Sequence, residues 1–264
     1  VLHRTRSLSQ TPYPAIFPSS VFMSSPTIKQ KKASKGVDYF VDQMSRPADF
    51  LDEVVTGLSK RQKAIPPKFF YDEIGSHLFN NICETPEYYV TTTEIALLNK
   101  AGGEISEVAG ASRIVVEFGC GSSLKIGALL HALQEPAEYL AIDISREHLL
   151  QTATDIANDF PQIRVGALCA DFSVSLQLPE QVGGEGKDRF AFFPGSTIGN
   201  QAPKNAQYFL HQVRGMVGVG GALLIGVDLK KDKSSTAISK LRKINPDLQL
   251  KSFNKKLTKQ NINQ

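Results

Sequence analysis

The chain has 264 residues, 41% of them hydrophobic and 21% charged, a composition that excludes collagen-like, coiled-coil and fully disordered proteins. No apolar stretch reaches the roughly 18–20 residues that cross a bilayer, and three dispersed cysteines without a CxxC pair suggest neither a disulfide framework nor a structural zinc site. The net charge of +4 is uneven, because residues 38–230 hold 15 basic and 24 acidic residues, and such an acidic body argues against nucleic-acid binding.

Both ends of the chain are basic. Residues 1–37 carry six Lys or Arg and no acid, and residues 231–264 carry nine against two acids, so we interpret both as solvated tails. Residues 1–26 are rich in Ser, Pro and Arg, which is typical of an organelle transit peptide or of translated sequence upstream of Met23. Residues 27–37 are predicted to be a linker. We expect a cytoplasmic protein, with organelle targeting by residues 1–26 as the alternative.

Residues 38–110 are predicted to form a helical segment. Apolar residues at helical spacing predict one or two helices over residues 38–59, and a further helix over residues 68–83. Thr91 or Thr92 is a suitable N-cap for the next helix. In the helix predicted over residues 68–83, the positions expected to point inward are Phe69, Phe70, Ile74, Leu78 and Phe79.

Strands alternate with helices after residue 110. Strands are predicted at residues 113–118, 139–142, 164–169, 190–193 and 223–227, with helices at residues 124–133, 146–158 and 204–217. This order predicts an α/β fold with a mostly parallel, doubly wound sheet that binds ligands at the carboxyl ends of its strands. Residues 111–230 are therefore predicted to form a Rossmann-like nucleotide-binding domain.

A glycine-containing turn follows the first of these strands. In Glu117-Phe-Gly-Cys-Gly-Ser122, glycines let the backbone approach a ligand, and the following helix offers free N–H groups. Asp143 ends the next strand, 24 residues after Gly119, where a carboxylate can accept hydrogen bonds from both ribose hydroxyls. A dinucleotide fingerprint needs a third glycine where Leu124 stands, so the shorter E-x-G-x-G pattern indicates S-adenosylmethionine (SAM) instead.

Asp171 and Phe172 follow the third strand and extend this predicted cofactor site. A carboxylate there suits the adenine amine, and an aromatic ring suits the adenine base. An ordinary tight turn would explain the glycines alone, and a helix cap would explain Asp143 alone. The combination at three strand ends favours a cofactor site.

Two further motifs are candidates for the substrate side. Residues 192–200 (FFPGSTIGN) follow the fourth strand and should face the methyl group, with the Asn200 amide oxygen free to accept from an amine. A turn with a capping Asn is the alternative. Residues 69–76 and 86–92 hold tyrosines that could orient an amine or stabilise a cation, although packing at a helix boundary gives the same pattern. The histidines show no metal-ligand spacing, and we expect no metal.

Seven segments within residues 66–232 are read together: PPKFFYDEIGSHLF, ETPEYYVTTTE, VVEFGCGSSLK, AIDIS, ADF, FFPGSTIGN and LLIGVDLKKD. In this order they resemble the histidine-specific, SAM-dependent Nα-methyltransferase family of ergothioneine biosynthesis. Fungal dimethylallyltryptophan N-methyltransferase is in the same group. The resemblance implies a class I methyltransferase that trimethylates L-histidine to hercynine, with SAM as cofactor and a small amino acid as partner. We expect a monomer.

The resemblance also assigns residues to roles. It implies that the cofactor is bound by Gly119, Gly121, Lys125, Asp143, Asp171 and Phe172. It implies that the catalytic residues are Tyr71, Tyr88 and Asn200, and that the substrate-binding residues are Tyr88, Gly195, Thr197 and Asn200. It places residues 38–110 on the substrate side.

The resemblance ends shortly after Asp232. In the family, a lid with a Glu and a Ser then reads the imidazole. We expect this lid and the last strands of the sheet to be truncated here, with residues 231–264 as a basic remnant. Three alternatives stay open: another amino-acid substrate such as a tryptophan derivative, a non-catalytic SAM-binding remnant, and, ranked third, a nucleic-acid methyltransferase.

Overall fold

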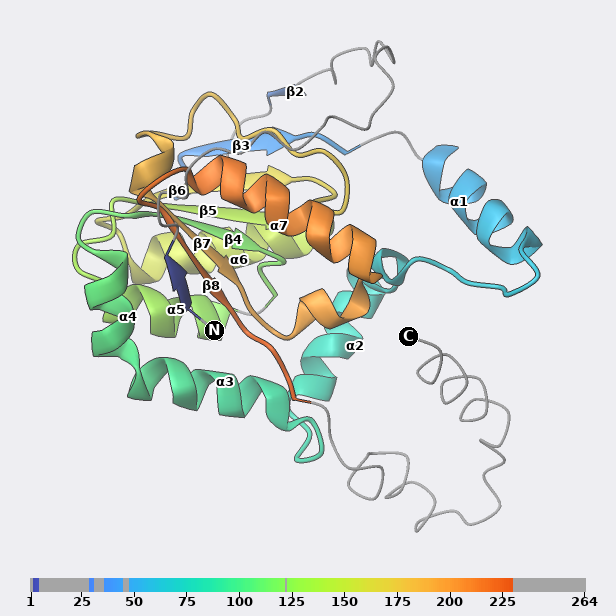
Figure 1. Ribbon diagram of the computed structural model, residues 1–264, viewed down its shortest axis with the longest axis horizontal. Helices are drawn as coiled ribbons and strands as arrows, with labels where there is room; N and C mark the ends of the chain where they lie inside the picture. The colour runs from blue at the N-terminus through green and yellow to red at the C-terminus, as the bar shows by residue number, and fades with distance from the viewer. Residues whose placement is uncertain (1, 5–28, 31–35, 45–47, 122, 230–264) are drawn as a thin grey trace, which may run out of the picture. The chain divides into compact units, whose positions relative to one another are not determined.

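The computed structural model describes residues 2–4, 29–30, 36–44, 48–121 and 123–229 (Figure 1). The chain divides into two compact units, Val1–Val227 and Asp228–Gln264. The fold described below is that of the first unit. The predicted basic remnant at residues 231–264 lies outside the described residues, as does most of the predicted transit segment.

Six parallel strands form the centre of an eight-stranded sheet with the order β1-β8-β7-β4-β5-β6-β3-β2. The parallel strands are β3 (Tyr39–Asp42), β4 (Ile114–Phe118), β5 (Glu138–Asp143), β6 (Arg164–Cys169), β7 (Arg189–Phe193) and β8 (Ala222–Ile225). The edge strands β1 (Leu2–Arg4) and β2 (Lys29–Gln30) pair antiparallel with β8 and β3. The predicted mostly parallel sheet is confirmed, and both edge strands lie within the residues predicted to be tail and linker.

Helices cover both faces of the sheet. The α-helices are α1 (Ala48–Ser59), α2 (Glu73–Cys83), α3 (Tyr89–Lys100), α4 (Gly102–Ala109), α5 (Ser123–Ala132), α6 (Arg146–Asp159) and α7 (Pro203–Val217). Short 3₁₀ helices are η1 (Pro67–Phe70), η2 (Gly186–Asp188) and η3 (Thr197–Asn200). Figure 1 shows α7 across one face and α5 and α6 on the other. Among the described residues, no helix is both long and apolar enough to cross a bilayer.

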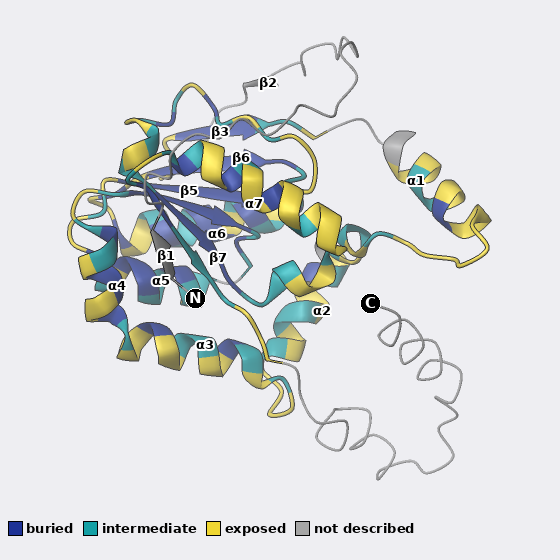
Figure 2. Ribbon diagram, viewed as in Figure 1, coloured by how far each residue is buried: buried dark blue, intermediate teal, exposed yellow. Residues whose placement is uncertain are grey.

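The core has two layers because successive strand residues point to opposite faces. Val115 belongs to the apolar cluster that includes Leu129 of α5, whereas Val116 belongs to the cluster that includes Phe209 of α7. All five residues of β4 are buried, and the central strands are dark blue in Figure 2. This two-sided burial explains why the strands from residue 113 onward are continuous apolar runs in the sequence.

The prediction of helix over residues 38–59 is wrong in its first part. Tyr39–Asp42 forms β3, which pairs parallel with β6, and only Ala48–Ser59 is helical. The strand is short and buried, so its apolar residues run together without any clear periodicity, and those of α1 follow closely enough to suggest one helical pattern. Pairing with β6 then decides the conformation.

The helix predicted over residues 68–83 differs in its start and in its exposed face. Asp72 caps α2 by accepting a hydrogen bond from the Gly75 N–H at 2.7 Å, which separates α2 from η1. Phe70, Ile74 and Leu78, predicted to point inward, are 67%, 71% and 57% exposed. The N-cap of α3 is Tyr88, so the predicted caps at Thr91 and Thr92 are wrong and both lie inside the helix.

A buried glutamate connects the amino ends of three strands, β3, β5 and β6. Glu138 is 4% exposed and accepts hydrogen bonds from the Tyr39 hydroxyl at 2.5 Å, from Arg164 at 2.9 Å and from the Gly183 N–H at 3.1 Å. Arg164 also stacks over the Tyr39 ring at 4.8 Å. Removal of the carboxylate therefore leaves a buried hydroxyl, an amide and a cation without their shared acceptor.

We expect Glu138→Ala to lower the free energy of unfolding by about 3 kcal/mol, because the buried Tyr39 hydroxyl and the Gly183 amide each lose their acceptor. Urea denaturation measures this change. The exposed Glu180 provides a matched control, and Glu180→Ala should stay within about 0.5 kcal/mol of wild type. Equal effects of the two substitutions would contradict the assignment.

Candidate active site

The turn between β4 and α5 has the backbone conformation that its glycines predict. Gly119 has φ of +75° and Gly121 has φ of +27°, both in the left-handed region that favours glycine. The Gly119 N–H donates to the Ile142 carbonyl at 2.8 Å, which ties the turn to the end of β5. A Cβ on Gly119 would meet only the Phe172 ring, at 3.8 Å. The turn is thus a surface without side chains beside two strand ends.

Asp143 is the last residue of β5, as predicted, and lies next to this turn. Its Oδ1 accepts from the Ser145 N–H at 2.9 Å, and its Oδ2 lies 3.9 Å from the Cys120 Sγ. Burial raises the pKa of the Asp143 carboxyl, and the hydrogen bond from Ser145 opposes that shift. The buried Ser145 Oγ has no partner within the described part of the chain. A carboxylate with free acceptor capacity and an unpaired hydroxyl fit a ligand that carries hydroxyl groups.

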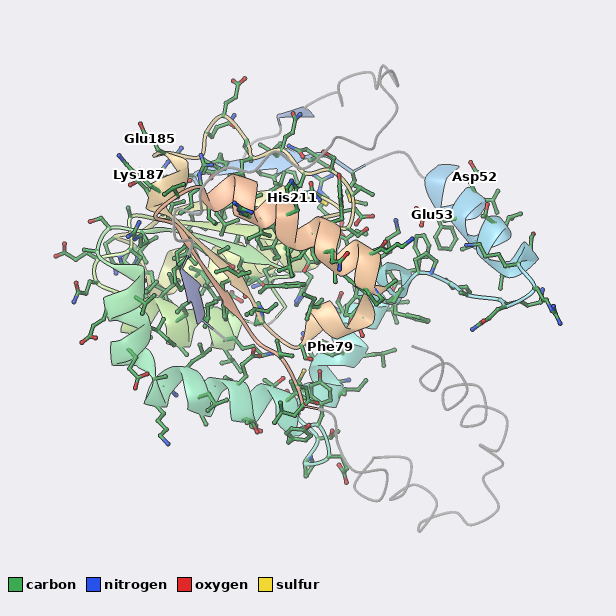
Figure 3. All side chains as sticks on the ribbon, in the orientation of Figure 1. Asp52, Glu53, Phe79, Glu185, Lys187 and His211 are labelled. Atoms are coloured by element: carbon green, nitrogen blue, oxygen red, sulfur yellow. The ribbon has the colours of Figure 1, made fainter. Side chains whose placement is uncertain are left out.

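Asp171 follows β6 and is held by the protein itself. One oxygen accepts from Lys68 of η1 at 2.7 Å, and the other accepts from the Ser173 N–H at 2.9 Å and its hydroxyl at 2.5 Å. Burial alone would raise the pKa of Asp171, but the bonds from Lys68 and Ser173 outweigh it and lower that pKa. Lys68 also contacts Glu53 of α1, labelled in Figure 3, at 2.7 Å. The sequence analysis missed Lys68.

Phe172 lies at the edge of an aromatic cluster. Its ring makes edge contacts with Phe118 and Phe193, at centroid distances of 6.0 and 5.8 Å, and a tilted contact with Phe209 at 5.8 Å. The ring remains partly exposed and lies against Gly119. It can therefore present an apolar surface beside the glycine turn.

Lys125 of α5 forms an ion pair that the sequence did not predict. Its Nζ lies 2.8 Å from Glu94 Oε2, and the two side chains are only 11% and 13% exposed. Glu94 also accepts from the Gly195 N–H, at 2.9 Å through Oε2 and 3.1 Å through Oε1. The structure therefore brings a predicted cofactor residue and a predicted substrate residue to one carboxylate.

The predicted substrate loop, residues 194–200, continues from β7 at the carboxyl edge of the sheet. Gly195 and Ser196 both have left-handed backbone conformations, with φ of +75° and +57°. The Thr197 hydroxyl donates to the Pro194 carbonyl at 2.9 Å and thereby tightens the turn. Asn200 ends η3 and is exposed, so its amide is accessible to a ligand.

The two predicted tyrosines are joined by a phenylalanine. Phe79 of α2, labelled in Figure 3, makes edge contacts with Tyr71 and Tyr88, at centroid distances of 5.8 and 5.7 Å. Burial raises the pKa of the Tyr71 phenol, and the nearby charge of Asp143 raises it further. The tyrosines thus belong to one aromatic row that approaches Asp143. The sequence analysis gave Phe79 a core role only.

Glu117, the acidic residue of the E-x-G-x-G pattern, is buried beneath the turn. It is 1% exposed and accepts a hydrogen bond from the Tyr139 hydroxyl at 2.6 Å. Burial raises the pKa of Glu117 well above its ordinary value of 4.5, although the bond from Tyr139 and the charge of Lys125 oppose the shift. The protonated form of Glu117 is therefore more favoured in the folded protein than in the unfolded chain.

A raised folded-state pKa means that stability is full below the unfolded pKa and is lost as pH rises through the folded pKa. Glu117→Gln keeps an acceptor for Tyr139 but cannot titrate. We expect its free energy of unfolding, relative to wild type, to increase as pH rises above 4.5, the ordinary pKa of the side chain. Thermal unfolding across this range measures the trend. The exposed Glu107 is the control, and a pH-independent difference for Glu117→Gln would contradict the shift.

The cluster contains acids and cysteines but lacks a metal-ligand set. In the described ranges, no group of three His, Cys, Asp or Glu side chains could hold a metal ion. The four histidines of the described helices, His77, His131, His148 and His211, lie on four different elements.

Comparisons with known proteins place these residues in a family context. The model of the family described as "Histidine-specific methyltransferase, SAM-dependent" matches residues 50–238. The chain is 37% identical over 184 residues to the histidine N-alpha-methyltransferase of Mycobacterium tuberculosis, covering 68% of this chain and 56% of that protein. It is 28% identical over 194 residues to the 4-dimethylallyltryptophan N-methyltransferase easF of Claviceps purpurea, covering 71% and 54%.

A third relative is much longer. The chain is 30% identical over 176 residues to ergothioneine biosynthesis protein 1 of Neurospora crassa, covering 64% of this chain and 20% of that protein. The matched region spans about half the length of the first two relatives.

Proposed function

This chain belongs to the family of histidine-specific, SAM-dependent methyltransferases, and we propose that it transfers methyl groups from SAM to the α-amino group of an amino acid, L-histidine first. The observation that carries the proposal is the meeting of the Gly119–Gly121 turn with the Asp143 carboxylate at the ends of β4 and β5. That arrangement is suited to a nucleoside at the carboxyl edge of a parallel sheet.

Bound SAM would supply an already activated methyl group, so the protein needs no nucleophile of its own. The Gly119–Gly121 turn, Lys125 and Asp143 would hold the cofactor. Asp171 and Phe172 would contact its adenine base. Asn200 and Tyr88 would orient the amine with its lone pair toward the methyl group. The partly buried aromatic row would exclude water from one side of the reacting atoms. The amine must be neutral to attack the methyl group, so the starting ammonium and the products of the first two transfers would each lose a proton to solvent before the next attack. The third transfer would leave a quaternary ammonium without an N–H, and every transfer would release S-adenosylhomocysteine.

Relatives support two candidate amines. The bacterial relative carries the name of a histidine methyltransferase and the Claviceps relative that of a dimethylallyltryptophan methyltransferase. The higher identity to the bacterial protein, 37% against 28%, favours histidine. We therefore propose histidine as the substrate and a tryptophan derivative as the alternative.

The test is incubation of the purified chain with SAM and each amine, followed by mass spectrometry of the products. Successive mono-, di- and trimethylation of histidine is the expected result. If only the tryptophan derivative is methylated, it replaces histidine as the proposed substrate. If SAM binds but no methylated product forms, the chain is a non-catalytic SAM-binding protein. If the chain neither binds SAM nor forms a methylated product, the proposal is overturned.

We also propose that the chain acts as a monomer in a reducing compartment, the cytoplasm. All three cysteines, Cys83, Cys120 and Cys169, are unpaired, which suits such a compartment. Size-exclusion chromatography with light scattering tests the first statement and cell fractionation the second.

A further inference from the structure

Glu94 joins elements from both sides of the candidate site. It lies in the middle of α3, the helix that begins directly after Tyr88. Its carboxylate contacts Lys125 of α5 at 2.8 Å and receives the Gly195 N–H of the 194–200 loop on both oxygens. A single side chain therefore connects the predicted cofactor lysine, the predicted substrate loop and the helix that Tyr88 caps.

Gly226 makes room for this carboxylate. A Cβ on Gly226, the residue after β8, would lie 1.8 Å from Glu94 Oε1, so no other residue fits without moving Glu94. A Cβ on Gly195 would make only an ordinary contact with Lys125 Nζ, at 3.4 Å, and glycine is favoured there by the φ of +75°. The strand ends of β7 and β8 are thus shaped around the Glu94–Lys125 pair.

Burial adds to the significance of the pair. At 13% and 11% exposure, both charges are largely removed from water, a cost that is offset only when each charge is paired and hydrogen-bonded. Lys125 has donors left over for a ligand, because an ammonium group has three N–H bonds. The ion pair with Glu94 holds the ammonium in place and so limits where its N–H bonds can point.

We propose that Glu94 is a positioning residue, which aims the Lys125 ammonium at the cofactor and fixes the 194–200 loop against it. The statement that Glu94 aims Lys125 at the cofactor rests on the proposed function. The statement that Glu94 fixes the loop depends only on the hydrogen bond from Gly195. Through both contacts, Glu94 sets the separation between the methyl donor and the amine, to which transfer rates are sensitive.

The two contacts can be separated by substitution. Glu94→Gln keeps an oxygen for the Gly195 N–H but loses the charge that pairs with Lys125, whereas Glu94→Ala loses both. We expect Glu94→Gln to weaken SAM binding about tenfold by calorimetry, with the Gly195 amide exchanging hydrogen as slowly as in wild type. In Glu94→Ala, the Gly195 amide should exchange about tenfold faster, and the KM for the amine should rise as well.

A double-mutant cycle shows whether Glu94 acts through Lys125. SAM should bind Glu94→Gln/Lys125→Met no more weakly than Lys125→Met alone, because the lysine that Glu94 aims is gone. The control is Glu104→Gln, an exposed acid on the neighbouring α4, which should bind SAM as wild type does. Unfolding midpoints measured in parallel show whether a general loss of structure accounts for weaker binding.

Several results would overturn the inference. Additive losses in the cycle would mean that Glu94 acts independently of Lys125, and tighter SAM binding by Glu94→Gln would mean that Glu94 competes with the cofactor. Unchanged exchange at Gly195 in Glu94→Ala would remove the loop anchor. If the wild-type chain binds no SAM, the proposed function fails, and the ligand-free exchange rates alone then decide the role of Glu94.

Discussion

Asp143→Asn is expected to weaken SAM binding by about 100-fold without lowering the stability of the free protein. Hydrogen bonds to a charged acceptor contribute about 1.5–3 kcal/mol each, so the loss of two ribose contacts to a carboxylate reaches that size. The asparagine oxygen still accepts from the Ser145 N–H. Because burial raises the pKa of Asp143, the ionised side chain destabilises the fold near neutral pH, and the neutral amide removes that penalty.

Calorimetric titration with SAM and thermal unfolding of the free protein give the two values. The substitution Asp159→Asn changes an exposed aspartate at the end of α6 and serves as the control. A variant that loses both binding and stability would indicate that Asp143 is a structural residue. Unchanged affinity would remove Asp143 from the cofactor site.

The sheet from β4 to β8 is predictable from sequence because its local signals agree. Each strand is a short apolar run, each is followed by a turn or helix signal, and parallel pairing buries both of its faces. The bounds predicted for the strand at residues 164–169 match β6, and Asp143 ends β5 as expected. Glycine at Gly119 is needed for a left-handed backbone, which a local pattern can indicate.

The N-terminal third is less predictable because its conformation depends on distant partners. Tyr39–Asp42 becomes a strand by pairing with β6, which lies more than a hundred residues further along the chain. The apolar positions of α2 do follow a helical period. Period alone, however, does not say whether a face is covered, and Ile74 and Leu78 are exposed.

In the candidate site, too, residues marked by local sequence signals were predictable, whereas residues placed by distant packing partners were not. Residues at strand ends were identified because the topology of a parallel sheet brings those ends together. Glu94, Lys68 and Phe79 come from helices or 3₁₀ turns whose placement depends on tertiary packing, and no local pattern marks them. Each of them contacts a residue that the sequence analysis did select, as Glu94 contacts Lys125 and Lys68 contacts Asp171.

Asn200→Ala should raise the dissociation constant for the amino acid by about tenfold and leave SAM affinity within about twofold of wild type. Asn200 is exposed at the end of η3, so its amide has no packing role whose loss would spread through the fold. One hydrogen bond to a charged or polar ligand group corresponds to such a change. Comparing the affinities for the amino acid and for SAM separates a substrate-binding residue from one that only shapes the loop. A distorted 194–200 loop would also disturb Lys125, through Gly195 and Glu94, and would therefore lower SAM affinity.

Calorimetry with L-histidine, in the presence of the demethylated cofactor product, measures the amine affinity without turnover. Asn205→Ala is the matched control, because it removes an exposed asparagine from the first turns of α7, a few residues further on. Equal losses for the amine and for SAM would assign Asn200 to loop structure. Equal effects of Asn200→Ala and Asn205→Ala would place the amine elsewhere, and the aromatic row of Tyr71, Phe79 and Tyr88 would then be the next surface to test.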